Sequence, residues 1–344
     1  MDPKPLVSVI IPSLNGAHFL PPTLESVLRQ DYPKLECIVV DGGSTDGTLD
    51  ILRKYGRQLK WSSEPDNGPP DAINKGWKIA TGEFLAWLNA DDLWAPGAVS
   101  TAVSYFMEHP EVDVLYGDCG IIDQNGEPIA VASVRDWNLR YAVEHCDHII
   151  YQAASFMRRS ILERVGWLWP KLCHDHELWL RISLMGGKIQ RVPALLAYAR
   201  HHSGNLGYRP DIVVPLKLEI TRRFFDYSVV PKELRNLRMR ALSNACLRGI
   251  DYTFLGSASL PEKMQRSLKL LRQAVKADPF NLIGVTRYLA RLVDLLIAAI
   301  LRRCLPRQIY EGLRDSKRIL FGKMADRRGG ARNPGVAGNE LKSC

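Results

Sequence analysis

The stretch VSVIIPSLNGAHFLPPTLESVLRQDYPKLECIVVDGGSTDGT, residues 7–48, decides the fold class. It opens with an apolar, β-branched run at 7–12 that ends at a proline, which predicts a buried strand. Residues 20–30 place apolar side chains at helical spacing, and two prolines near the start favour a first helical turn. Residues 36–40 predict a second buried strand, which ends at the sequence DGGSTDG. Strand, helix and strand in this order indicate an α/β protein with a parallel sheet.

The same alternation continues as far as residue 92. Helices are expected at about 48–55 and 70–79, with strands near 59–61 and over 84–88. Such repeated units predict a parallel sheet with helices on both faces, and these sheets bind ligands beyond the carboxyl ends of their strands. Asp41 and the pair Asp91–Asp92 both follow a predicted strand. The sequence therefore predicts a polar site at this edge of the sheet.

The pattern becomes looser after residue 100, which leads to a prediction of three regions. A strand is expected at 112–116 and helices at 158–165 and 176–186, whereas the chain beyond 211 is mainly helical in pattern. We expect an α/β domain over 1–210, a helical basic extension over 211–325 and a disordered tail over 326–344, where glycine and polar residues dominate.

Charge is distributed unevenly between the front and the back of the chain. Residues 1–210 carry 20 Lys and Arg against 25 Asp and Glu, whereas residues 211–344 carry 26 against 12. A basic back of this kind favours an anionic partner. Within it, GVTRYLARLVDLLIAAILRR (284–303) has the pattern of an amphipathic helix, which either packs on neighbouring helices or lies on an anionic membrane surface. Nucleic acid is disfavoured, because the basic residues lack interleaved aromatics.

Location is predicted from the cysteines and from the apolar segments. The seven cysteines are scattered and form no CxxC pair, which is typical of reduced thiols in a cytosolic chain. The first residues do not read as a signal peptide, and no run of eighteen uncharged apolar residues occurs. We therefore expect a cytoplasmic protein, with at most peripheral contact with the cytoplasmic face of a membrane.

Three separated runs of this sequence resemble the family 2, inverting glycosyltransferases of the GT-A fold. They are residues 7–48, SEPDNGPPDAINKGWKIATGEFLAWLNADD (63–92) and HDHELWLRI (174–182), and the resemblance spans roughly residues 5–205. It implies a GT-A, Rossmann-like domain that moves a sugar from a nucleotide-diphosphate donor, a UDP-sugar or a relative of one. The acceptor would be a hydroxyl of a glycan or lipid-linked glycan, and the cofactor Mn²⁺ or Mg²⁺.

The resemblance assigns donor binding to Pro12, Asp41, Asp71 and Asn74. A carboxylate at Asp41 can accept hydrogen bonds from a base or a ribose, while the alternative for this loop is a turn with a helix cap. Asp71 has a second interpretation too, as an acid favoured by the dipole of a helix start. Ile73 stands where the family usually has an arginine.

The segment from Asn89 to Asp92 stands where the family has its DxD motif, with Asn89 in place of the first aspartate. Hard divalent ions prefer carboxylate oxygens and keep positions open for phosphate. The resemblance therefore assigns the metal to Asp91, with Asp92 as an assisting carboxylate. Asn89 remains able to hydrogen-bond a ribose hydroxyl of the donor.

Asp175 matches the catalytic base of the family, and as a helix-start residue it also suits a simple capping role. The neighbouring Cys173, His174 and His176 suggest zinc, but a second paired cluster is lacking. Gly117 and Asp118 are expected to lie beside the sugar or the acceptor. Arg200 and His202 are expected to contact the diphosphate or the metal.

Two other classes of protein remain as alternatives. A sugar-nucleotide nucleotidyltransferase would want a basic, glycine-rich loop after the first strand, where this chain has SLNG at 13–16. A non-catalytic nucleotide- or glycan-binding scaffold of the same fold would lack the base or the metal carboxylate. Sequence motifs of this kind do not identify the transferred sugar or the glycosidic linkage that is formed.

Overall fold

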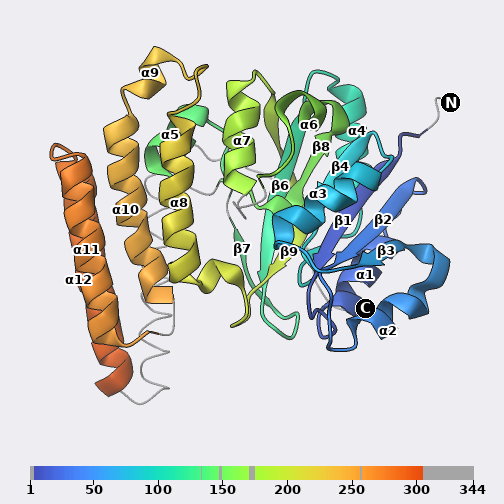
Figure 1. The fold of residues 1–344 in the computed structure, drawn as a ribbon, viewed down its shortest axis with the longest axis horizontal. Coiled ribbons are helices and arrows are strands. Elements are labelled where there is room, and N and C mark those ends of the chain that lie inside the picture. Colours follow the sequence, from blue (N-terminus) through green and yellow to red (C-terminus); the bar gives the residue numbers. More distant parts are fainter. Residues whose placement is uncertain (1–3, 133, 147–148, 170–174, 256–257, 305–344) are drawn as a thin grey trace, which may run out of the picture. The chain divides into compact units, whose positions relative to one another are not determined.

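The structure is a computed structural model that describes residues 4–132, 134–146, 149–169, 175–255 and 258–304. Residues up to Val285 belong to one compact unit, and a second unit begins at Thr286. Figure 1 shows the first unit as a twisted sheet with helices against it and a set of long helices beyond. The predicted disordered tail, 326–344, lies outside the described residues.

The first four strands form the predicted parallel sheet. They are β1 (Val7–Ser13), β2 (Leu35–Asp41), β3 (Lys60–Ser63) and β4 (Phe84–Trp87), in the spatial order β3-β2-β1-β4. The helices α1 (Leu20–Leu28), α2 (Thr48–Tyr55) and α3 (Pro69–Ile79) connect them, with a short turn, η1 (Gly56–Gln58), before β3. Prolines occupy the first helical positions of α1 and α3, as expected for residues that lack the N–H group left free there.

The second half of the sheet is mixed, and most of it is absent from the sequence-based prediction. It continues from β4 through β8 (Ser155–Arg158), β6 (Val114–Ile122), β9 (Ile189–Arg200) and β5 (Leu93–Trp94), and β7 (Pro128–Ala132) pairs with β6. β8 is antiparallel to β4 and β6, whereas β6 and β9 are parallel. The helices here are α4 (Ala98–Glu108), α5 (Leu139–His145), α6 (Arg159–Val165) and α7 (Asp175–Leu184), with η2 (Gln152–Ala154) before β8.

The core lies on both faces of the sheet, because alternate residues of each strand point to opposite sides. On one face, Ile10 of β1 and Trp87 of β4 pack with α3, α6 and α7. On the other face, Val9 and Ile11 of β1 pack with α1, α2 and α4. All three β1 residues are fully buried, which fits the uninterrupted apolar run that predicts this strand.

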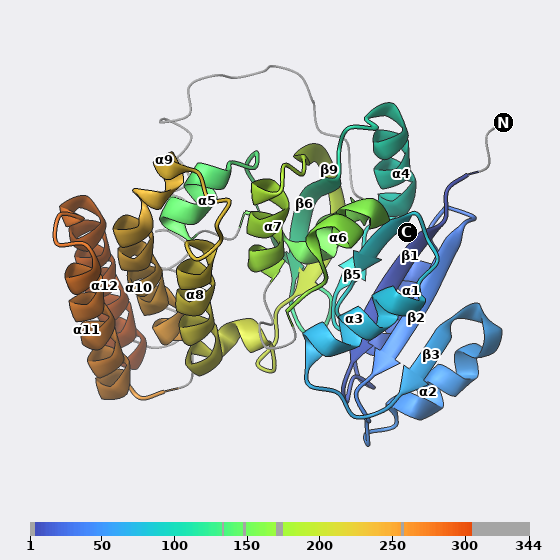
Figure 2. The same cartoon turned by 45° about the horizontal axis from the view of Figure 1, so that its top comes forward.

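The chain beyond β9 is helical, as predicted. After η3 (Leu206–Tyr208) come α8 (Pro210–Phe224), α9 (Lys232–Arg235), α10 (Arg238–Leu255), α11 (Leu260–Ala277) and α12 (Leu282–Cys304). Figure 2 shows α8, α10 and α11 as neighbouring helices. Ile220 and Phe224 of α8 belong to the same apolar cluster as Trp179 of α7, so α8 is continuous with the core of the sheet. A domain boundary near residue 210 stays a prediction.

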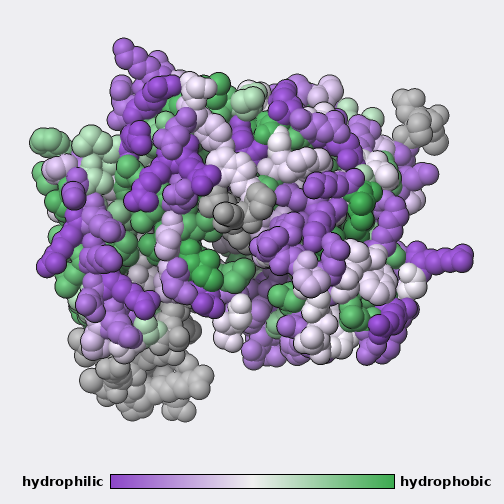
Figure 3. All heavy atoms as spheres, viewed as in Figure 1, coloured by the Kyte–Doolittle hydropathy of each residue, from purple (hydrophilic) through white to green (hydrophobic). Residues whose placement is uncertain are grey.

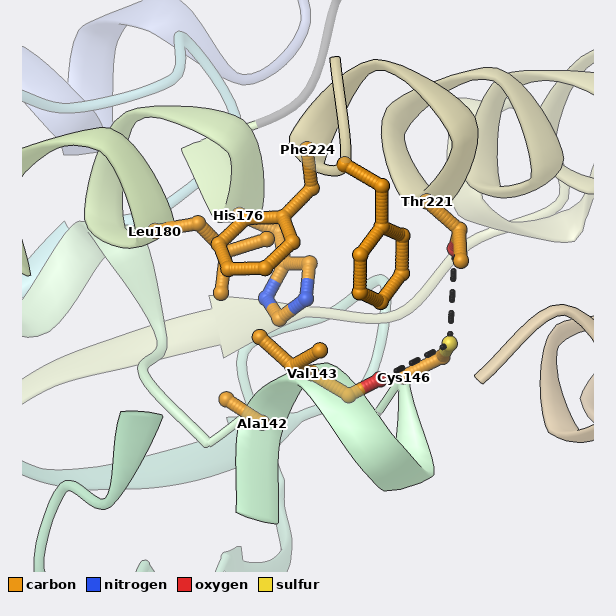
Figure 4. Close-up of a pocket in the computed structure, with 8 residues that line it drawn as sticks. Ala142, Val143, Cys146, His176, Leu180, Thr221 and Phe224 are labelled. Carbon is orange, nitrogen blue, oxygen red and sulfur yellow. Dashed lines mark hydrogen bonds between the residues drawn. The ribbon is translucent and has the colours of Figure 1, made fainter. Parts of the chain in front are cut away.

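A small, partly open hollow lies where the helices α5, α7 and α8 meet. Its walls are mainly apolar, with His176 of α7 and Cys146 beside them (Figure 4). The Sγ atom of Cys146 lies 3.4 Å from Thr221 Oγ1 and donates to the carbonyl of Ala241, so the thiol fastens the end of α5 to α8 and α10. No helix among the described residues is long and apolar enough to cross a membrane.

Candidate active site

Asp91 is joined to two residues that lie more than a hundred positions later in the chain. Its Oδ2 atom lies 2.8 Å from His202 Nε2 and accepts a hydrogen bond from Asn205 Nδ2 at 3.1 Å. The side chains of Asp91 and His202 retain 23% and 16% of their exposure, so the cluster is open to solvent. Asp91 follows the carboxyl end of β4 and His202 follows β9. The predicted polar edge of the sheet therefore carries a carboxylate and an imidazole side by side.

Asp92, the neighbour of Asp91, faces the interior instead. Its Oδ1 accepts a hydrogen bond from the backbone N–H of Arg200 at 2.9 Å, and its Oδ2 accepts one from Asn89 Nδ2 at 3.0 Å. Burial, together with the nearby charge of Asp91, raises the pKa of Asp92 to about 8. Thr23 Oγ1 donates to the carbonyls of Ala90 and Asp92 from the side of α1. Asp92 thus holds the loop that presents Asp91, and metal binding by Asp92 stays a prediction.

Arg200 braces the same loop from behind. Its Nε donates to the carbonyl of Asp91 at 2.8 Å, and Nη1 donates to the carbonyls of Asp123 and Gln124 at 3.2 and 3.3 Å. The guanidinium also lies over the ring of Phe19, 5.1 Å from its centroid. Arg200 is buried and committed to backbone contacts. A contact of this residue with a diphosphate stays a prediction.

Asp41 closes β2 and is fully buried. Its carboxylate accepts hydrogen bonds from the N–H groups of Gly43 and Ser44, from the Ser44 hydroxyl and from Ser63 Oγ at 2.7 Å. Ser13, its register partner on β1, has a buried hydroxyl without a hydrogen bond to any described residue. Pro12 precedes Ser13 at the same strand end. An unsatisfied buried hydroxyl beside a carboxylate is where a polar ligand group would fit.

Asp46 lies one residue before Gly47, the N-cap of α2, which has no side-chain cap. Its carboxylate accepts hydrogen bonds from the N–H and the hydroxyl of Thr48 at the start of α2 and from the N–H of Ala17 at 3.0 Å. The loop after β1 and the loop after β2 are therefore tied together.

The two residues predicted on α3 differ in their surroundings. Asp71, in the first turn, accepts hydrogen bonds from the backbone and side chain of Asn67 and faces Lys75 at 3.6 Å. The hydrogen bond from the Asn67 N–H and the charge of Lys75 lower the pKa of Asp71. Asn74 is buried and exchanges two hydrogen bonds with the backbone of Leu168, at 2.7 and 3.1 Å. Donor binding by these residues stays a prediction, and the amide of Asn74 already holds the chain ahead of α7.

Asp175 is the first residue of α7. Two stacked tryptophans link this helix to β4, the strand that precedes Asp91. Trp179 Nε1 lies 3.4 Å from Asp175 Oδ2. The Trp179 ring stacks on Trp87 with centroids 5.8 Å apart. Trp87 ends β4, the strand that leads into Asp91. The start of α7 therefore lies against the strand that carries the acidic loop.

A buried network of hydrogen bonds and one ion pair fastens α7 to its neighbours. The sequence pattern does not predict this network. Arg181 pairs with Glu177 at 2.8 Å, and its remaining N–H groups donate to the carbonyls of residues 165–167. Tyr227, beyond α8, donates from its hydroxyl to Glu177 Oε1 at 2.9 Å. Desolvation and the charge of Glu177 raise the pKa of the Tyr227 hydroxyl. Glu177 and Arg181 are four apart, which is the only signal that the sequence offers.

Gly117 and Asp118 lie inside β6 and have structural surroundings. A Cβ atom at Gly117 would come 2.4 Å from the carbonyl oxygen of Ala194, so only glycine lets β9 approach at this point. Asp118 pairs with Arg191 of β9 at 2.8 Å. Contacts of either residue with sugar or acceptor stay predictions.

A zinc site at the start of α7 rests on Cys173 and His174, which lie outside the described residues. Among the residues that the structure describes, no group of three or more His, Cys, Asp and Glu is placed to hold a metal ion. A metal at Asp91 would therefore depend on oxygens supplied by a ligand. Asn205, the second partner of Asp91, carries no signal in the sequence and follows His202 in a short polar turn.

Residues 8–166, a little under half of the chain, match the family described as glycosyl transferase family 2. An uncharacterized glycosyltransferase of Rickettsia typhi is 31% identical over 194 residues, 52% of this chain and 60% of that protein. A PGL/p-HBAD biosynthesis glycosyltransferase of Mycobacterium bovis is 41% identical over 119 residues, 33% of this chain and 46% of that protein. The chain thus spans about half the length of these relatives.

Solved structures share the fold. TarS of S. aureus, residues 1–349 in complex with UDP-GlcNAc, superimposes with a TM-score of 0.51 at 20% identity and covers 79% of this chain and 91% of that one. The mannosyltransferase PcManGT of Pyrobaculum calidifontis, in complex with GDP-Man and Mn²⁺, gives 0.55 at 22% identity over 86% and 88%. The predicted fold class, a GT-A α/β domain followed by helices, is confirmed.

Proposed function

We propose that this protein is an inverting glycosyltransferase that uses a nucleotide-diphosphate sugar, a divalent metal and Asp175 as general base. The observation that carries the proposal is the cluster of Asp91, His202 and Asn205 at the carboxyl end of β4, with the start of α7 packed against the same strand. The match of residues 8–166 to glycosyl transferase family 2 supports the reaction class.

The donor would occupy the edge formed by the ends of β1, β2 and β4. The unsatisfied hydroxyl of Ser13 lies beside Asp41, and both fit a base or ribose. The related structures hold UDP-GlcNAc and GDP-Man, and each of these donors carries a diphosphate. We favour a UDP-sugar, with Pro12, Asp71, Asn74 and Asn89 along the donor side.

The residues present fit Mn²⁺ or Mg²⁺. Such ions use one or two carboxylates and complete their shell with phosphate oxygens and water, so a three-residue protein cluster is not required. Asp91 and the imidazole of His202 would hold the ion, while Asp92 and Arg200 keep the loop in place. When bound, the metal supplies positive charge against the departing diphosphate.

Asp175 would accept the proton of the acceptor hydroxyl. The acceptor oxygen then forms a bond to the anomeric carbon, and the bond to the diphosphate breaks with its electron pair leaving on the nucleotide. One displacement from the opposite face inverts the anomeric configuration. The Trp179 N–H lies 3.4 Å from Asp175 Oδ2 and would help to orient the carboxylate for this step.

The acceptor is proposed to be a glycan or a lipid-linked glycan, with peripheral contact between the basic C-terminal part and an anionic membrane on its cytoplasmic face. The excess of positive charge beyond residue 210 supports that contact. A non-catalytic scaffold and a nucleotidyltransferase remain the competing classes.

A panel of nucleotide sugars with Mn²⁺ or Mg²⁺ tests the proposal, with release of free nucleoside diphosphate as the measurement. Metal-dependent release from one donor is expected, and it should stop in Asp175→Asn while nucleotide affinity persists. Full turnover by this variant would refute the base assignment. Formation of nucleoside triphosphate and sugar 1-phosphate from a nucleotide sugar and added pyrophosphate, with no free nucleoside diphosphate, would indicate a nucleotidyltransferase instead.

A further inference from the structure

The helix α11 is held on α10 by one face only. Ser267, Leu270 and Ala274 are buried, and Leu270 lies against Gly249 of α10. At 100° per residue these three positions fall on one side of the helix. The opposite side of α11 is left to solvent.

That outward side has two adjoining stripes. One stripe is apolar, with Leu268 and Val275 exposed to 46% and 43%. The other is basic, with Lys269, Arg272 and Lys276 exposed, and none of these three forms an ion pair with a described residue. Helical spacing places the two stripes side by side, the pattern of helices that lie in a membrane interface. In Figure 3, hydrophobic residues are grouped beside hydrophilic ones over the C-terminal helices.

The turn after α11 extends this surface with large apolar side chains. Phe280 and Ile283 are each 85% exposed, the two highest values among the large hydrophobic residues that the structure describes, and Leu282 between them is 66% exposed. Leaving such side chains in water costs free energy, so three together mark a binding surface.

This turn is rigidly attached rather than loosely displayed. Asn281 is buried and donates to Ser243 Oγ and Asn244 Oδ1 of α10, at 3.0 and 2.9 Å. Asp278, its only acidic residue, is buried and paired with Arg240 of α10. The inward contacts hold Phe280 and its neighbours outward, and the pairing removes the negative charge that would repel an anionic surface.

We propose that the basic and apolar stripes of α11, with the turn 280–283, form a docking surface for an anionic phospholipid bilayer. This inference rests on the peripheral membrane contact in the proposed function and gives that contact a place: on α11 and its junction with α12, whose first two residues are Leu282 and Ile283, rather than on the later turns of α12. Phe280, Leu282 and Ile283 enter the headgroup region, while Lys269, Arg272 and Lys276 lie against lipid phosphates. Charge complementarity selects the bilayer as the occupant, because an apolar tip beside a basic stripe offers nothing to a nucleic-acid base edge.

The test measures binding of the full chain to vesicles of phosphatidylcholine with 30% phosphatidylglycerol. Charge reversal in K269E/R272E/K276E should lower the partition coefficient by about 100-fold or more, since each basic residue near an anionic surface contributes about 1 kcal/mol. F280S/I283S should lower it by about 100-fold through lost apolar burial. Both variants should keep the wild-type melting temperature, because the altered side chains are exposed.

Matched controls lie on the sheet-bearing part of the chain. K34E/K54E/R57E makes the same change in charge at exposed positions, and I79S/M107S removes two exposed apolar side chains. Both controls should bind vesicles as the wild type does. Neutral vesicles, or high salt, should weaken wild-type binding.

The outcomes separate this inference from the proposed function. If the wild type binds and the α11 variants bind equally while L289S/V293S on α12 does not, the surface lies on α12 and this inference is wrong. If the wild type ignores anionic vesicles but releases nucleoside diphosphate, both membrane statements fail and sugar transfer stands. Loss of a dimer in F280S/I283S, by sedimentation, would assign the surface to self-association instead.

Discussion

Replacing Asn74 by alanine separates two roles for this residue, donor contact and support of the base. Its amide exchanges hydrogen bonds of 2.7 and 3.1 Å with the carbonyl and N–H of Leu168, and both groups are buried. Each such bond contributes about 1 kcal/mol, and a buried backbone group left without a partner costs about 1–3 kcal/mol. We expect Asn74→Ala to lower the free energy of unfolding by about 2–4 kcal/mol.

Asn74→Ala should also lower activity, because Leu168 precedes the segment that ends at Asp175. The chain runs from there towards Asp175, and Arg181 holds it only through residues 165–167. A loosened segment would misplace the base, so kcat should fall by tenfold or more while the Kd for the nucleotide sugar changes less than threefold.

Denaturant unfolding and steady-state nucleoside diphosphate release are the two assays. Asn67→Ala is the matched control, because Asn67 is an exposed asparagine at the same helix start whose side chain contacts only Asp71 among the described residues. It should change stability by less than about 0.5 kcal/mol. Wild-type stability of Asn74→Ala together with a large rise in the donor Kd would refute the supporting role and favour direct donor contact.

Three further predictions concern the base, α7 and the sheet. Asp175→Asn should reduce turnover by at least about 100-fold with an unchanged nucleotide Kd in calorimetry, because only proton acceptance is lost; a change in Kd alone would argue for a donor role. Tyr227→Phe should cost about 1–2 kcal/mol in denaturant unfolding, because the buried Glu177 carboxylate loses a hydrogen bond; an unchanged midpoint would show that the bond is not formed in solution. Although burial alone would raise the pKa of Glu36, hydrogen bonds from Lys60, Ser8 and Thr81 hold it below its ordinary value, so the stability it adds is present near neutral pH and is lost as the pH falls through the lowered pKa. Glu36→Gln should lose that acid dependence in pH-resolved melting, and an identical pH profile would contradict the assignment.

The first half of the fold follows from the sequence because its signals are local. The β1 and β2 strands each contain an apolar stretch, residues 9–11 and 37–40, and each ends at a polar residue. Fully buried parallel strands have this appearance whatever they pack against. The second half gives weaker signals, since β8 has only four residues and β9 contains Arg191 and Pro193.

The resemblance names Asp41, Asp91 and His202 as candidate site residues, but the sequence does not show how their side chains are held. Asp41 and Asp91 are marked by strand ends, a property of one segment. The pairing of Asp91 with His202 and Asn205 joins positions 111 and 114 apart, and the link of Asn74 with Leu168 spans 94. Contacts over such separations depend on tertiary packing, which periodicity does not contain. The inward orientation of Asp92 is likewise set by Arg200, on a strand that the pattern did not reveal.

The most direct measurement is the Mn²⁺ dependence of nucleotide-sugar affinity in the wild type and in Asp91→Ala. The wild type should bind its donor at least tenfold more tightly with Mn²⁺ than with a chelator, and Asp91→Ala should bind with the same weak affinity in both conditions. A donor affinity in Asp91→Ala that still rises with Mn²⁺ as in the wild type would contradict a metal-bound diphosphate at the end of β4.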